Sequence, residues 1–172
     1  VFDVISPAIA KVQQLPKLKA IGVIGTRALV NSGVYQKSLT DAGHRVVAYP
    51  APLLVPLVEE GWLNKPETKR IIKTYLTPFK QAQVDTLILA CTHYPLLKRL
   101  ISPRLSKRTV VIDPAVETAV ALANWLQVNP EVDTTLTRGR SHFYVSDLTP
   151  QFQVIAEKWL GGKITLERVN LI

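Results

Sequence analysis

Short apolar, β-prone runs alternate with segments of helical spacing along most of this chain. The runs that predict strands are 20–25, 45–49, 84–89, 109–112, 143–145 and 164–169. The segments that predict helices are 29–39, 53–60, 66–83 (with an interruption at Pro78), 96–101, 114–128 and 150–160. Strands that alternate with helices are typical of βαβ units. The predicted fold is therefore α/β, with a parallel sheet.

A helix signal begins at residue 113. Asp113 is predicted to be the N-cap residue, and Pro114 suits the first helical position. We expect the apolar positions of this helix to be buried, namely Val116, Val120, Leu122 and Trp125. The polar stretch 129–140 predicts a loop or linker. The tryptophans at 62, 125 and 159 are expected to be core or interface residues.

The composition is that of a soluble globular protein, because 47% of the 172 residues are apolar and 20% are charged. No apolar run approaches the roughly 20 residues that span a membrane as a helix. The single cysteine excludes an internal disulfide framework and fits a reducing cytoplasm. It also excludes a cysteine-based zinc site, and His44, His93 and His142 have no metal-ligand spacing. We therefore expect neither a metal nor a membrane segment.

Two basic clusters contribute much of the formal net charge of +8. The first is Lys69, Arg70, Lys73 and Lys80, and the second is Lys98, Arg99, Arg104, Lys107 and Arg108. Such clusters attract anionic substrates or nucleic acids. No DNA-reading helix pattern and no RNA-stacking aromatic motif accompanies them. We therefore interpret them as solvated helix faces and do not expect nucleic acid as a partner.

The only cysteine, Cys91, follows the apolar run 84–89, and Pro95 then begins a helix signal. Cys91, Thr92 and His93 are thus predicted to lie at the carboxyl end of a strand, where open α/β folds place their ligand sites. A thiol beside an imidazole can ionise and act as a base or nucleophile. The alternative is a cysteine that only packs and a histidine that is a structural hydrogen-bond partner. The position at a strand end favours the functional interpretation.

The segment 89–97, Leu-Ala-Cys-Thr-His-Tyr-Pro-Leu-Leu, resembles the second cysteine motif of the glutamate racemases, in the aspartate/glutamate racemase superfamily. Four other segments resemble the family in order and spacing: 21–28, 52–61, 111–115 and 143–147. The resemblance covers the chain from about residue 20 to its end. It implies a racemase-like fold, in which the full enzyme has two similar α/β domains.

Two motifs of that family do not occur here. Its members are longer than this chain, open with an Asp-Ser-Gly motif and carry a first Cys-Asn-Thr motif. Residues 1–3 echo the opening only faintly, so no role is assigned to Asp3. We therefore expect the later two-thirds of a racemase, without the portion that holds the first catalytic cysteine. Residues 1–113 are expected to form the second α/β domain, and 114–172 to return to the incomplete first domain.

The resemblance also implies the chemistry. The family needs no cofactor and interconverts L- and D-glutamate with two cysteines on opposite faces of the substrate, one a thiolate base and the other a thiol acid. By resemblance, Cys91 is the second cysteine and His93 assists it. Glu59 matches an acidic residue close to that histidine, although the sequence leaves Glu60 open as the residue that points inward.

Two threonines complete the expected site. Thr92 matches a residue that contacts the substrate, and Thr26 resembles a pocket threonine, although it could simply cap the following helix. Asp113 is interpreted as a helix cap. The expected catalytic residues are thus Cys91, His93 and Glu59, and the expected substrate-binding residues are Thr92 and Thr26.

The resemblance predicts a bacterial cytoplasmic enzyme that supplies D-glutamate for peptidoglycan, with glutamate as its small-molecule partner. Family members often dimerise, which leaves a homodimer open. The alternatives are an aspartate or other amino-acid racemase of the same superfamily, or an inactive fragment that acts only as a binding module. A cysteine phosphatase is excluded, because Leu97 occupies the position where its phosphate loop needs arginine.

Overall fold

The computed structural model describes residues 1–16, 18–136, 139 and 141–170. The chain divides into two compact units, Val1–Pro130 and Glu131–Ile172, and each is considered by itself. The predicted division between residues 113 and 114 concerns the domains of a longer protein and stays a prediction. No helix in the described ranges has the length and apolar character needed to cross a membrane.

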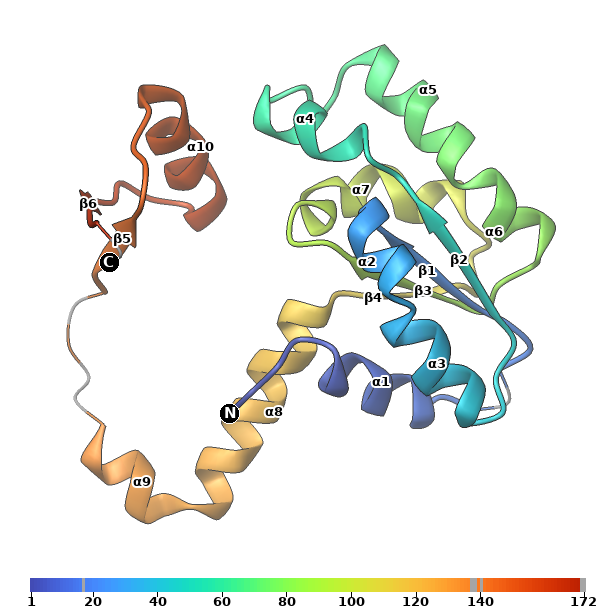
Figure 1. Ribbon diagram of the computed structural model, residues 1–172, viewed down its shortest axis with the longest axis horizontal. Helices are drawn as coiled ribbons and strands as arrows, with labels where there is room; N and C mark the ends of the chain where they lie inside the picture. The colour runs from blue at the N-terminus through green and yellow to red at the C-terminus, as the bar shows by residue number, and fades with distance from the viewer. Residues whose placement is uncertain (17, 137–138, 140, 171–172) are drawn as a thin grey trace. The chain divides into compact units, whose positions relative to one another are not determined.

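The first unit is built on a four-stranded parallel sheet in the order β2-β1-β3-β4 (Figure 1). Its strands are β1 (Ile21–Gly25), β2 (Val46–Pro50), β3 (Thr86–Ala90) and β4 (Val110–Ile112). Gly25 at the end of β1 pairs with Pro50 on one side and with Ala90 on the other, so three strands finish at the same level. The predicted α/β fold with a parallel sheet is confirmed.

Helices cover both faces of this sheet, because successive residues of a strand point to opposite faces and every residue of the central strands β1 and β3 is buried. Leu87 and Leu89 belong to one core and Ile88 and Ala90 to the other. The first core also takes side chains from α4 (Leu54–Glu59), α5 (Pro66–Tyr75), α6 (Thr77–Gln81), the 3-10 helix η1 (Tyr94–Leu97) and α7 (Lys98–Ile101). The second takes side chains from α1 (Ser6–Gln13) and α3 (Val34–Asp41).

Two predicted helices are each divided into two. Gly33 has φ +69° and separates α2 (Arg27–Ser32) from α3, because this left-handed conformation ends a helix and suits glycine. The predicted interruption near Pro78 is confirmed, since α5 ends at Tyr75 and α6 starts at Thr77. After α7, the 3-10 helix η2 (Ser102–Arg104) leads to β4.

Helix α8 (Pro114–Val128) forms as predicted, with Asp113 as its N-cap, but its apolar stripe is not buried. Val116, Val120, Leu122 and Trp125 are 40–53% exposed. Helix α8 packs against α1 and β3, and Pro114 is its one buried residue among those described. The apolar spacing identified a hydrophobic face without identifying what covers it, so the predicted burial is wrong. Trp62 and Trp159 are also exposed, and none of the three tryptophans is a core residue.

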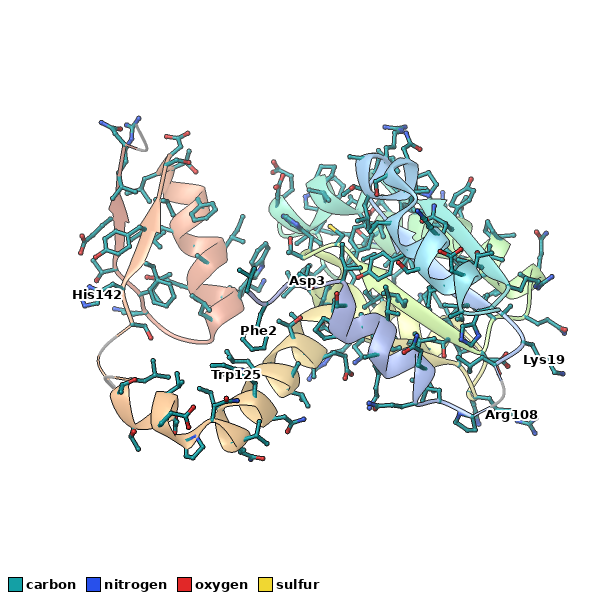
Figure 2. The ribbon with its side chains drawn as sticks, turned by 60° about the horizontal axis from the view of Figure 1, so that its bottom comes forward. Phe2, Asp3, Lys19, Arg108, Trp125 and His142 are labelled. Carbon is teal, nitrogen blue, oxygen red and sulfur yellow. The ribbon has the colours of Figure 1, made fainter. Side chains whose placement is uncertain are left out.

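Towards its carboxyl end, α8 contacts the N-terminal segment. The ring of Phe2 packs edge-on against Trp125, with centroids 5.7 Å apart (Figure 2).

The second unit contains a two-stranded parallel sheet. Strands β5 (Phe143–Val145) and β6 (Leu166–Arg168) pair with each other, and α10 (Pro150–Leu160) connects them along the chain, as the sequence predicts. The predicted loop 129–140 contains a short helix, α9 (Pro130–Thr135), so that prediction is wrong for its first half. A proline suits the first turn of a helix, which explains the start at Pro130. Residues 137, 138 and 140 of the predicted loop lie outside the described residues.

Candidate active site

The loops that follow β1 and β3 leave neighbouring strands in opposite directions. After β1 the chain enters α2 and α3 on one face of the sheet, and after β3 it enters η1 and α7 on the other. In open α/β sheets, a crevice forms where the connections of two adjacent strands go to opposite faces, and ligands bind there. The topology therefore places the binding crevice beside Thr26 and Cys91.

A pocket of about 320 Å³ occupies this place. It is lined by residues after β1, β3 and β4 together with Val4 and Ile5 from the N-terminal segment. Most of the lining is apolar, and its side-chain polar groups include those of Thr26, Cys91, Thr92 and Asp113. An apolar pocket with a few convergent polar groups is typical of small-molecule sites. The sulfur of Cys91 thus lies beside a cavity and is not enclosed by the core.

Cys91 is a free, half-buried cysteine in a tight turn. Its backbone N–H donates to the carbonyl of Leu89 at 2.8 Å, and its own carbonyl accepts from the N–H of Tyr94 at 3.2 Å. Burial raises the pKa of the Cys91 thiol. The backbone N–H groups of His93 and Tyr94 lower this pKa, and the Glu59 carboxylate raises it. The thiol is therefore held mainly in its protonated form near neutral pH.

His93 connects the thiol to a carboxylate. Its Nδ1 lies 3.9 Å from the sulfur of Cys91 and 3.3 Å from the hydroxyl of Thr92. Its Nε2 lies 3.3 Å from Oε1 of Glu59, the last residue of α4. A hydrogen on Nε2 directed at Glu59 leaves Nδ1 of a neutral ring to accept the proton of the thiol. The structure brings Cys91, His93 and Glu59 together, as the resemblance implies, although it left Glu60 open as the alternative to Glu59.

The choice between Glu59 and Glu60 could not be made from the sequence. In the structure, the Glu59 carboxylate makes the contact with His93, whereas Glu60 follows the end of α4. The side chain of Glu59 remains 55% exposed and that of His93 20%. A pair this open to water contributes little to stability, about 0–1 kcal/mol. Its effect is therefore to orient the imidazole rather than to hold the fold together.

Thr26 has two roles in the structure. Its hydroxyl accepts from the N–H of Leu29 at 3.2 Å and so caps α2, and the residue also lines the pocket. Asp113 behaves in the same way, since its carboxylate accepts from the N–H of Ala115 at 3.0 Å and the residue lines the pocket. The cap interpretation of both residues is correct. The sequence did not predict that Asp113 also lines the pocket.

Sequence reasoning missed Tyr94. Its ring is buried, and its hydroxyl donates to the carbonyl of Ala51 at 2.8 Å and to that of Gly25 at 3.1 Å. These bonds join the turn after β3 to the end of β1 and to the residue after β2. A buried tyrosine needs a partner for its hydroxyl, which is the signal that could have identified it. Tyr94 is a positioning residue for the Cys91 turn.

Within the described ranges, no three histidine, cysteine, aspartate or glutamate side chains converge in a way that could hold a metal ion.

Comparisons with known proteins identify the family. The family model described as Asp/Glu/Hydantoin racemase matches residues 1–123. The glutamate racemase of Geobacter metallireducens is 36% identical over 166 residues, which are 95% of this chain and 62% of that protein. The glutamate racemase of Neisseria gonorrhoeae is 38% identical over 174 aligned positions, covering 100% of this chain and 63% of that protein.

Solved structures give the same result. The crystal structure of glutamate racemase from Francisella tularensis in complex with D-glutamate matches with a TM-score of 0.88 at 31% identity, covering 99% of this chain and 64% of that one. The isoform RacE1 of Bacillus anthracis matches with a TM-score of 0.86 at 34% identity, covering 99% and 65%. The chain therefore spans less than two thirds of the length of these relatives.

Proposed function

The chain belongs to the Asp/Glu/hydantoin racemase family, and we propose that it is the part of a glutamate racemase that carries one of the two acid/base cysteines. The observation that carries this proposal is the place of Cys91 in the lining of a pocket, at the carboxyl ends of two paired strands whose following connections lie on opposite faces of the sheet. The relatives that support it are themselves named glutamate racemases. One of them has been crystallised with D-glutamate.

The proposed reaction moves the α-hydrogen of glutamate. As a thiolate, Cys91 takes this hydrogen from the α-carbon as a proton and becomes a thiol, and the bonding electrons remain on the α-carbon. A second group on the opposite face then delivers a proton and inverts the centre. In the reverse direction, the Cys91 thiol is the donor and ends as the thiolate.

The resting thiol suits the donor role, because burial raises its pKa. For the base role the proton must leave, and Nδ1 of His93 lies 3.9 Å away to receive it. Glu59 beside Nε2 stabilises the imidazolium that results. A bound amino acid also brings an ammonium group, whose positive charge favours the thiolate.

Thr92 and Thr26 are the proposed substrate contacts. Both line the pocket, on the turns after β3 and β1. Thr26 already accepts from the N–H of Leu29, so its hydroxyl hydrogen is available to a substrate carboxylate. We also propose that the whole protein supplies D-glutamate for peptidoglycan in a bacterial cytoplasm and that it acts as a homodimer.

The experiment incubates the 172-residue chain with D- and L-glutamate, and with D- and L-aspartate, in heavy water. Proton NMR follows the signal on the α-carbon. Because the chain has one cysteine, it should exchange the α-hydrogen of one glutamate enantiomer without interconverting the two. Preferential exchange on aspartate would indicate an aspartate racemase. Rapid racemisation of glutamate would mean that the second acid/base group lies within this chain.

A further inference from the structure

A second hollow lies at the amino ends of the strands, at the opposite edge of the sheet from Cys91. It has a volume of about 530 Å³. Its lining includes Lys19, which lies two residues before β1, and Asp85 and Thr109, which directly precede β3 and β4. Figure 2 shows Lys19 and Arg108, which both line the hollow, at the same end of the first unit. The proposed racemase chemistry makes no use of this place.

Four cationic side chains line the hollow, and they come from three separate parts of the sequence. They are Lys19, Lys80, Arg104 and Arg108. The structure thus brings together members of the two basic clusters, which the sequence analysis treated as separate solvated faces. Among the described residues, none of the four forms an ion pair with a carboxylate. Concentrated positive charge without a counter-charge attracts anions.

The one acidic residue of the hollow is already bonded. The carboxylate oxygen Oδ2 of Asp85 accepts from the backbone N–H of Lys19 at 2.5 Å and from that of Ala20 at 3.3 Å. These bonds fix the carboxylate against the chain before β1 and reduce its repulsion of an incoming anion. The hollow therefore keeps a clear excess of positive charge.

Hydrogen-bond donors are also present and positioned. The half-buried Arg104 donates one N–H to the carbonyl of Leu100 at 2.8 Å, which holds its guanidinium in place and leaves further N–H groups free. The hydroxyl of Ser106 accepts from the N–H of Arg108 at 3.3 Å, so its hydrogen remains available to a ligand. Guanidinium groups and hydroxyls together match the oxygens of a phosphate group.

We propose that this hollow is a binding site for a small anion that carries one or two phosphate groups. The concave shape and its volume favour a small ligand over an extended polymer. Phe79, the aromatic residue of the lining, is fully buried and offers no face on which a nucleic-acid base could stack. The proposal is independent of the racemase chemistry at Cys91.

The test uses pyrophosphate and inorganic phosphate as probes at constant ionic strength, with the amide signals of the chain followed by NMR. Saturable shifts should appear at Lys19, Val84, Asp85, Ser106 and Thr109. The variant K80Q/R108Q should bind pyrophosphate about tenfold more weakly, because two charged contacts are lost. Lys80 and Arg108 are both exposed, so the variant should keep its fold, and each single variant should show a smaller loss.

The matched control is K98Q/R99Q, which removes the same charge from exposed residues of α7 outside the hollow. Its affinity should stay within about twofold of the wild type, since distant exposed charges are screened by salt. Cys91→Ala should bind pyrophosphate normally, whatever its effect on glutamate. Equal losses in both double variants, or shifts that never saturate, would overturn the proposal. Tighter binding of an oligonucleotide than of pyrophosphate, across both basic clusters, would replace it with a nucleic-acid surface.

Discussion

Replacing Tyr94 with phenylalanine removes one hydroxyl and two hydrogen bonds without changing the ring. The hydroxyl bonds join the Cys91 turn to the carbonyls of Ala51 and Gly25. Neither carbonyl would be left without a donor, because Ala51 also accepts from the N–H of Leu54 at 3.1 Å and Gly25 from that of Ala51 at 2.9 Å. The expected loss of unfolding free energy is therefore that of an ordinary hydrogen bond with no group left unsatisfied, about 1 kcal/mol.

Urea unfolding measures this loss as a lower midpoint with an unchanged slope. Heating should show a fall in Tm of about 2–4 °C for each kcal/mol. The control is Tyr49→Phe, because Tyr49 is 40% exposed and its ring contact with Tyr75 does not depend on the hydroxyl. The control should change stability by less than about 0.5 kcal/mol. Equal effects of the two substitutions would refute the claim that the Tyr94 hydroxyl holds the strand ends together.

Three further predictions concern the core, a helix cap and the thiol. Gly22→Ala should lower the free energy of unfolding, measured in urea, by about 1–3 kcal/mol, because the new Cβ would lie 2.7 Å from Phe79 and 2.8 Å from Leu87. An unchanged free energy of unfolding would show that both side chains move aside. Thr26→Ala should lower the free energy of unfolding by about 1 kcal/mol, because the cap of α2 is lost, whereas Thr26→Ser should keep the cap and the stability. Equal losses in the two variants would contradict the role of the Thr26 hydroxyl as a cap. Alkylation of Cys91 by iodoacetamide should rise with a midpoint above the ordinary thiol value of about pH 8.5, because burial raises its pKa. A midpoint below that value would contradict the effect of burial on this pKa.

The sequence predicted the elements whose signals are local. The run before Cys91 is apolar and β-prone, and it forms β3 with the predicted turn after it. The motif around Cys91 also indicated the family, and this prediction is confirmed. Asp113 caps its helix as expected, because an N-cap depends on neighbouring residues alone.

Features that depend on distant parts of the chain could not be predicted in this way. The contact of Glu59 with His93 depends on how α4 ends beside the turn after β3, so the sequence could not choose between Glu59 and Glu60. The exposed stripe of α8 has the spacing of a buried one, because spacing shows which face is apolar but not what covers it. The hollow at Lys19 joins residues that are more than 80 positions apart.

The central claim is that the thiol of Cys91 exchanges hydrogen with the α-carbon of an amino acid in the neighbouring pocket. The most direct measurement is the rate at which deuterium from heavy water enters the α-position of glutamate, for the wild type, Cys91→Ser and Cys91→Ala at equal folded concentration. The account predicts that Cys91→Ala abolishes exchange and that Cys91→Ser slows it by several powers of ten, each equal to about 1.4 kcal/mol of barrier. Exchange at the wild-type rate in Cys91→Ala would contradict it.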